Sequence, residues 1–448
     1  DGYVVKLTPA GAHAWSTYLG GTNAEYGESI AVDRDGNAYA TGYTTSAGWT
    51  SGGWDTTQSG GWDAYVVKLT PAGAHAWSTY LGGTGDEYGY GIAVDGSGNV
   101  HANGHTGSPG WTSGGWDTTI NGGYDGFVVK LTPAGSHVWS TYLGGASSDQ
   151  GRGIAVDGSG NVYATGQTQS AGWTSGGGDM TQNGGWDGYV VTLTPAGAHA
   201  WSTYLGGAKD DWGYGISVDG SGNVYVTGQT QSAGWTSGGG DTTQNGGYDA
   251  YVVKFTPTGA HAWSTCLGGE ADDEGYGIAV DGSGNVYATG YTQSADWVFG
   301  GWQTAYGGNT DAFVVKIIGF VAPDAPSDSG AAAIGLDTIT WTWVDNSSDE
   351  TGFNVWADPG AGAPVTLQAT TAADATAWTQ GGLPVNSLHT FQVAATNADG
   401  DSERTAPFPA WTLAAVPAAP VVGNPTGATL DLSVGAGDGN PAGTEYAL

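Results

Sequence analysis

The stretch that decides the fold is DAYVVKLTPAGAHAWSTYLGG, which runs from Asp63 to Gly83. Close copies begin at Asp1, Asp125, Asp187 and Asp249, and a shortened copy begins at Asp311. Successive copies start 62 residues apart, since 63 − 1 and 125 − 63 both give 62. A fixed period of this length is the sequence signature of a repeat architecture, in which each repeat is one supersecondary unit.

Each repeat predicts four strands and no helix. Residues 63–69 alternate apolar and polar side chains with a period of two, and residues 75–81 do the same after a Pro-Ala-Gly turn. Residues 91–95 and 99–103 form a second pair of strands, joined by Gly-Ser-Gly, which is a hairpin signal. Four-stranded units repeated several times are typical of a β-propeller, because radial closure leaves only short strand edges exposed.

Composition narrows the function classes. The 448 residues include 84 glycines, and 12% are aromatic, so an all-β fold with tight turns is expected. Nine basic and 42 acidic residues give a formal net charge of −33, which disfavours nucleic-acid and membrane-surface partners. No run of 18 apolar residues indicates membrane insertion. No Gly-x-Ser-x-Gly elbow, His-Glu-x-x-His motif or phosphate loop occurs, so we expect no enzyme.

The repeats resemble the bacterial β-propeller repeat called SBBP. The resemblance rests on GYGIAVDGSGNVYATGYT at 275–292, DAFVVK at 311–316 and WSTYLGG at 77–83, and it covers about 1–318. It implies a propeller in secreted or cell-surface bacterial proteins, with no fixed catalytic chemistry and no required cofactor.

The number of blades depends on how the ring closes. The innermost strand of each repeat is expected to carry Ile30, Ile92, Ile154, Ile216 or Ile278. Five such strands favour five blades, with the N-terminal pair of strands completing the last blade. The copy at Asp311 is then surplus, so a ring of six or seven blades with further upstream repeats is the alternative. The chain begins inside a repeat, which suggests a piece of a longer polypeptide.

Three domains are expected: a propeller at 1–320, a sandwich at 321–414 and an incomplete second sandwich at 415–448. The phrase GLPVNSLHTFQVAATNADGDS at 382–402 resembles the late strands of a fibronectin type III domain, and Trp343 matches the core tryptophan of that family. The resemblance implies a spacer or adhesive module.

One acidic residue recurs in each repeat, just before the innermost strand. The set is Glu25, Glu87, Asp149, Asp211 and Asp273. Carboxylates near loop carbonyls suit Ca²⁺, which takes six to eight oxygen ligands. The alternative is an acidic loop that is simply solvated.

One tryptophan recurs in the long loop of each repeat. The set is Trp49, Trp111, Trp173, Trp235 and Trp297, and Trp54, Trp116 and Trp302 stand beside three of them. Exposed indole faces among Gly, Asn and Asp would stack on sugar rings or contact a partner. The alternative is that each indole anchors its own twenty-residue loop.

The leading interpretation is a secreted or cell-surface scaffold or adhesion protein, and a subunit of an extracellular filament or surface array. Its expected partners are copies of itself, joined head to tail by strand pairing, and surface glycans. The alternative is a lectin-like propeller that binds carbohydrate through the tryptophan loops. An extracellular glycan-cleaving enzyme comes third.

Overall fold

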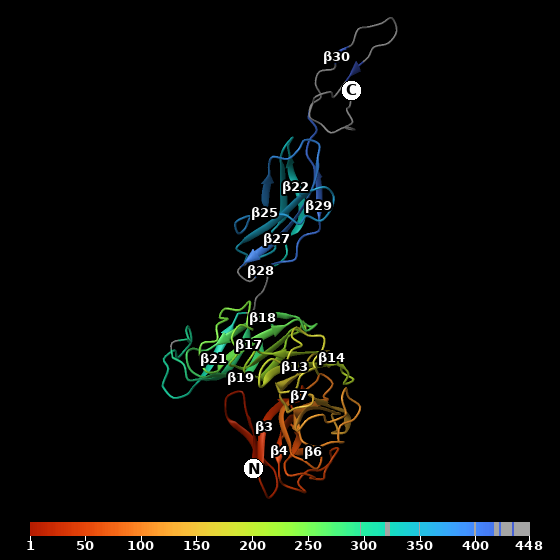
Figure 1. Ribbon diagram of the computed structural model, residues 1–448, viewed down its shortest axis with the longest axis vertical. Helices are drawn as coiled ribbons and strands as arrows, with labels where there is room; N and C mark the ends of the chain where they lie inside the picture. The colour runs from red at the N-terminus through yellow and green to blue at the C-terminus, as the bar shows by residue number, and fades with distance from the viewer. Residues whose placement is uncertain are drawn as a thin grey trace. The chain divides into compact units, whose positions relative to one another are not determined.

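The structure is a computed structural model that describes residues 1–295, 297–318, 323–348, 350–397, 400–415, 421–422 and 432–433. Every regular element in these ranges is a β-strand, so the all-β prediction is confirmed. No helix in the same ranges is long and apolar enough to cross a membrane. The chain divides into two compact units, Asp1–Gly319 and Phe320–Leu448, which are described separately (Figure 1).

The first unit contains four complete four-stranded blades, each an antiparallel meander in chain order. Their strands are β3 (Glu25–Val32), β4 (Ala38–Thr44), β5 (Asp63–Leu69) and β6 (His75–Leu81); β7 (Glu87–Val94), β8 (Val100–Thr106), β9 (Asp125–Leu131) and β10 (His137–Leu143); β11 (Asp149–Val156), β12 (Val162–Thr168), β13 (Asp187–Leu193) and β14 (His199–Leu205); β15 (Asp211–Val218), β16 (Val224–Thr230), β17 (Asp249–Phe255) and β18 (His261–Leu267). The predicted propeller blades are therefore present.

The third strand of each blade is buried on both faces. In β5, Tyr65 and Val67 pack into one apolar cluster with the preceding strands, whereas Val66 packs into another with the next blade. The alternation of side chains along a strand produces this division. Each interface between blades is therefore a small apolar core of its own.

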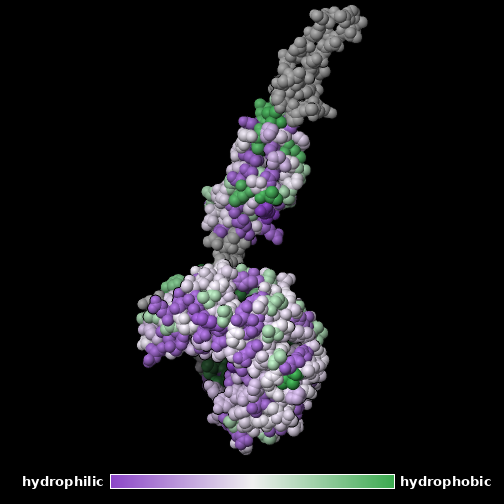
Figure 2. All heavy atoms as spheres, viewed as in Figure 1, coloured by the Kyte–Doolittle hydropathy of each residue, from purple (hydrophilic) through white to green (hydrophobic). Residues whose placement is uncertain are grey.

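The two ends of the blade array are incomplete. Strands β1 (Gly2–Leu7) and β2 (His13–Leu19) pair with each other, and β19 (Asp273–Val280), β20 (Val286–Thr292) and β21 (Asp311–Ile317) form a three-stranded sheet. The prediction that the N-terminal pair completes the last blade is wrong. Both β1 and β21 are the third strand of a repeat, so β21 already fills the place that β1 would take, and β1 and β2 form a sheet of their own. Figure 2 shows an indentation on the left edge of this unit.

A tryptophan on the outermost strand joins each blade to the next one. The Trp139 indole Nε1 donates a hydrogen bond to the carbonyl oxygen of Pro195, 3.1 Å away in the following hairpin turn. Gly197 in that turn has a φ of 80°, and a Cβ there would lie 2.7 Å from the indole ring. Both the shape and the left-handed conformation therefore require glycine. Trp15, Trp77 and Trp201 donate to Pro71, Pro133 and Pro257 in the same way.

The second unit contains a β-sandwich. One sheet contains β22 (Ser327–Ile334), β23 (Ile339–Val344) and β26 (Ala377–Gln380); the other contains β24 (Gly352–Pro359), β25 (Leu367–Thr370), β27 (Leu388–Asn397), β28 (Gly400–Asp401) and β29 (Phe408–Trp411). Trp341, Trp343 and Phe391 stack within its core. Of the segment at 415–448, only Ala415, β30 (Val421–Val422) and β31 (Leu432–Ser433) are described, so the expected second sandwich lies outside the described residues.

We predict that Trp139→Ala lowers the free energy of unfolding by about 3–5 kcal/mol, because a nearly fully buried indole and its hydrogen bond are lost together. The measurement is chemical denaturation of the full chain. Trp302→Ala is the control, since Trp302 is 100% exposed. An unchanged midpoint for Trp139→Ala would contradict the structural role.

Candidate functional site

The recurring loop tryptophans are half-buried anchors. The Trp173 ring meets the Tyr189 ring edge-on at 5.1 Å between centroids, and its Nε1 donates to Thr168 Oγ1 at 3.1 Å. Trp111, Trp235 and Trp297 repeat both contacts in their own blades, and Trp49 repeats the ring contact. One edge of each indole is therefore engaged inside the blade, and the loop is fixed there.

One of these anchors, Trp173, also lines a pocket with a second tryptophan, Trp116. Trp116 lies 6.5 Å from Trp173 and 4.3 Å from His199 between ring centroids. The pocket between Trp116 and Trp173 has a volume of about 480 Å³. Its polar lining is Asp117 and Asn121, which are joined by a 2.9 Å hydrogen bond. We call this the tryptophan pocket.

The preceding repeat carries the same arrangement, and later repeats do not. Trp54 lies 6.4 Å from Trp111 and 4.3 Å from His137. Gly178 and Gly240 occupy the positions that correspond to Trp116. Trp302 occupies it in the last repeat but is fully exposed. Two repeats of this chain therefore provide a natural comparison that lacks the second indole.

The recurring acidic residues are buried, so the expectation of a solvated acidic loop is wrong. Glu25 is 5% exposed, and Glu87, Asp149, Asp211 and Asp273 are fully buried, each at the start of an innermost strand. They lie one to a blade and are not brought together. Asp149 accepts hydrogen bonds from the Gly145 backbone N–H, Ser170 Oγ and Thr168 Oγ1. A Cβ at Gly144 would collide with this carboxylate, which explains the recurring Gly-Gly pair.

A second carboxylate in each complete blade is buried near the first. Asp125 accepts from the backbone N–H groups of Asn121 and Gly122, at 2.8 and 3.0 Å. Burial, with a smaller contribution from the negative charge of Asp149, raises the pKa of Asp125 to about 7. Burial likewise raises the pKa of Asp187 and of Asp249 to about 6. These acids accept hydrogen bonds from turn backbone N–H groups and so stabilise the turns. The hydrogen bonds offset part of the free-energy cost of burying the carboxylates.

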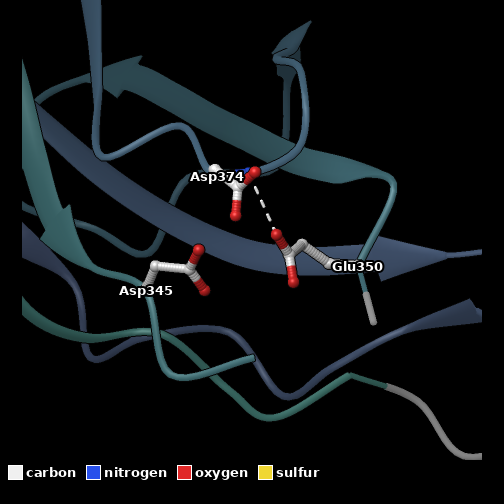
Figure 3. A group of neighbouring side chains, drawn as sticks. All are labelled: Asp345, Glu350 and Asp374. Atoms are coloured by element: carbon white, nitrogen blue, oxygen red, sulfur yellow. Dashed lines mark hydrogen bonds between the residues drawn. The ribbon is translucent and has the colours of Figure 1, made fainter. Parts of the chain in front are cut away.

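Three acids do meet in the sandwich unit, at a place that the repeat pattern did not indicate. The carboxylates of Asp345, Glu350 and Asp374 turn toward one another, with oxygens within 4.8 Å (Figure 3). Glu350 accepts a 3.0 Å hydrogen bond from the Asp374 backbone N–H. In the described residues this is the one group of three or more acidic, histidine or cysteine side chains with spacing suited to a cation. The calcium ligands expected in the blades are not grouped in this way.

A further cluster, which sequence reasoning missed, lies on the innermost two strands of the blades. It comprises three positions of the repeat, occupied by Tyr26, Tyr88, Gln150, Trp212 and Glu274; by Glu28, Tyr90, Arg152, Tyr214 and Tyr276; and by Tyr43, His105, Gln167, Gln229 and Tyr291. We call it the inner tract. Its signal was available, because these positions differ between repeats whose framework is nearly the same.

We predict that Asp125 contributes stability at pH 5 that is lost by pH 8. Because the folded pKa of Asp125 lies above its ordinary value of 3.8, the folded state binds more protons than the unfolded state between these values. The contribution of Asp125 to the free energy of unfolding therefore falls as the pH rises through this window, by up to about 1.4 kcal/mol per pH unit.

The measurement is the melting temperature of the wild type and of Asp125→Asn across this range. Between pH 5 and pH 8 we expect the melting temperature of Asp125→Asn to rise relative to that of the wild type, and Asp35→Asn, a control at an exposed turn, to follow the wild type. Parallel profiles for Asp125→Asn and the wild type would contradict the assignment.

Comparison with known proteins supports the repeat assignment. The family model described as SBBP, beta-propeller repeat, matches residues 14–48, 76–110, 138–172, 200–234 and 262–296. Regulatory protein FlaEY of Caulobacter vibrioides is 26% identical over 313 residues, which is 65% of this chain and 31% of that protein. An uncharacterized WD repeat-containing protein, L264, of Acanthamoeba polyphaga mimivirus is 25% identical over 354 residues, 64% of this chain and 26% of that protein.

Solved structures match at low scores. The FN5 domain of Drosophila Lar is 22% identical and covers 20% of this chain and 98% of its own, with a TM-score of 0.18. Domains A168–A170 of titin are 14% identical, and the match covers 51% of this chain and 74% of the titin chain, with a TM-score of 0.24. The chain spans less than a third of the length of its two curated relatives. What is established by these comparisons is that the chain carries five SBBP β-propeller repeats.

Proposed function

We propose that the protein is a non-catalytic adhesion scaffold of the cell surface or extracellular space, which binds carbohydrate through the tryptophan pocket and through the matching ring pair of Trp54 and Trp111. The observation that carries this proposal is the pocket of about 480 Å³ between Trp116 and Trp173. Pockets of a few hundred Å³ with aromatic walls and a few polar groups are the usual form of a small-ligand site. Indole faces pack on the C–H face of a pyranose ring, and Asp117 and Asn121 offer hydrogen bonds to its hydroxyl groups.

The buried carboxylates favour a scaffold over an enzyme. A general acid or base needs an oxygen that reaches the substrate. The oxygens of Asp149 and Asp125 accept hydrogen bonds from their own turns and are fully buried. In this proposal the blades supply rigidity, and the sandwich unit, as a fibronectin type III-like module, acts as a spacer. The regulatory role named for FlaEY remains that of a much longer relative.

We predict that the full chain binds a subset of neutral oligosaccharides on a glycan array, and that the double variant Trp54→Gly, Trp116→Gly reduces this binding at least tenfold. Glycine at these positions copies Gly178 and Gly240, so the loop conformation is already compatible with it. Trp302→Gly is the matched control in the repeat without a completed pocket, and it is expected to leave binding unchanged.

Binding that survives in the double variant would refute the pocket as the site. An absence of binding by the wild type to every glycan would refute the lectin function.

Self-association is the second part of the proposal, and the ends of the blade array support it. Tyr3 is 71% exposed, whereas Tyr65 at the same position of the next repeat is fully buried against the preceding strand pair. At the other end, Val314 is 74% exposed, whereas Val252 is fully buried. The two ends thus present the two complementary sides of an interface between blades, so one copy fits the next head to tail.

We predict that the chain forms concentration-dependent oligomers in sedimentation velocity, and that Tyr3→Asp makes it monomeric because a charge would enter the apolar contact. Val138→Asp is the control, since Val138 is 45% exposed but lies on an interior blade. A monomer at every concentration, or equal dissociation by both variants, would contradict head-to-tail assembly.

A further inference from the structure

The inner tract is where near-identical repeats become different from one another. Four repeats share Gly-x-Gly-Ile-Ala/Ser-Val-Asp, and the variable residue is Tyr90, Arg152, Tyr214 or Tyr276; the first repeat has Glu28 there. The framework residues on either side stay the same because they form the blade. The neighbouring positions of the inner tract also vary between repeats. A surface adapted to one asymmetric ligand requires such variation on a constant framework.

Aromatic rings form the first half of the inner tract. The Tyr43 ring stacks on Tyr26 at 5.0 Å and meets Tyr88 of the next blade at 4.9 Å. Tyr88 in turn lies 4.9 Å from His105. Tyr26 is 51% exposed, so one ring of this group is open to solvent. These contacts pass from one blade to the next without an apolar aliphatic side chain between them.

A single cation lies in the middle of the tract. The Arg152 guanidinium lies 4.3 Å from the centroid of the Tyr90 ring, and it donates to the side-chain oxygens of Gln150 and Gln167 at 3.1 and 3.4 Å. These acceptors are neutral. In the described residues the ion pairs join Asp95 to His101 and to Lys130, and none involves Arg152. A guanidinium has five N–H donors, so donors remain for a ligand beside the two contacts with glutamine.

The second half of the tract is tyrosine-rich and carries one carboxylate. Tyr214 lies 5.1 Å from Tyr276, which is 49% exposed. The hydroxyl groups of Tyr276 and Tyr291 donate to Glu274 at 2.8 and 2.6 Å. The Glu274 carboxylate is thus held by hydroxyl groups of its own blade and, in the described part of the chain, forms no ion pair with Arg152.

Arg152 is the only positive group of the inner tract near neutral pH, and the tract also carries two carboxylates, Glu28 and Glu274. Burial, together with the nearby Arg152 charge, lowers the pKa of His105 to about 3, so its imidazole is neutral. An arginine stacked on an aromatic ring and free of a carboxylate partner is well suited to bind a planar anion in two-pronged fashion.

We propose that the inner tract binds a sugar that carries a carboxylate, with the carboxylate on the Arg152 guanidinium and the pyranose ring against the exposed tyrosine faces. A single carboxylate fits one guanidinium, whereas a polyphosphate would meet an overall charge of −33 with only one compensating cation. The site is separate from the tryptophan pocket and has its own ligand class.

The test compares methyl glucuronide with methyl glucoside, which differ at one carbon of the sugar, where the first carries a carboxylate. Binding to the full chain is measured by ligand-observed NMR titration. We expect the glucuronide to bind at least tenfold more tightly, and Arg152→Gln to lower its affinity to that of the glucoside. Tyr276→Ala should weaken both sugars, since it removes an exposed ring face outside the blade core.

Two controls separate this site from the others. Arg34→Gln removes an arginine outside the tract, and Trp116→Gly removes the tryptophan pocket; neither should change glucuronide affinity. Equal affinity of the wild type for the two sugars would overturn the proposal, as would a loss in Arg34→Gln equal to that in Arg152→Gln. Acetate binding as tightly as the glucuronide would overturn the sugar assignment, because the tyrosine faces would then contribute nothing.

Discussion

The contact on which the propeller unit depends is the indole of one blade seated on the Pro-Ala-Gly or Pro-Thr-Gly turn of the next. The hydrogen bond from Trp139 to Pro195 fixes the turn, and Gly197 allows the ring to approach it closely. The same contact recurs from Trp15 to Trp201. Since the same contact joins the strands at four successive junctions, this part of the array behaves as a one-dimensional chain of interfaces.

This organisation divides each repeat into a framework and a variable part. Buried acids such as Glu87 and Asp149 belong to the framework, because their oxygens accept the hydrogen bonds of glycine-rich turns. Indoles such as Trp173 belong to both parts, with one edge fixed by Thr168 and another lining a pocket. The inner tract is the variable part. Because the stabilising contacts recur in every blade, residues can differ between blades only at positions that take no part in those contacts.

Much of the fold was accessible from the sequence, because the period and the two-residue alternation are local properties. The four strands of each repeat and the structural role of Trp139 followed from them. The burial of Asp149 did not follow, since a carboxylate in a Gly-rich loop has the same local pattern whether water or a neighbouring turn donates to it. Pairing of β1 with β2 alone was also missed, because closure depends on the angle between blades.

The candidate sites were accessible in part. The loop tryptophans were identified correctly as a recurring set, but only contact between neighbouring repeats reveals that Trp116 and Trp173 share a pocket. The inner tract has no periodic signal, because its residues differ from one repeat to the next. Arg152 and Tyr276 occupy one position of the repeat and stand out only when the repeats are compared for their differences.

Hydrogen exchange measured along the full chain by mass spectrometry tests the nearest-neighbour account most directly. Strands β9 and β13, which have a joined blade on both sides, should exchange most slowly, and the end strands β1, β2 and β21 should exchange fastest, because they lack a neighbour on one side. A gradient of protection that falls from the middle of the array toward both ends is the predicted result. Equal protection of β9, β1 and β21 would contradict the account.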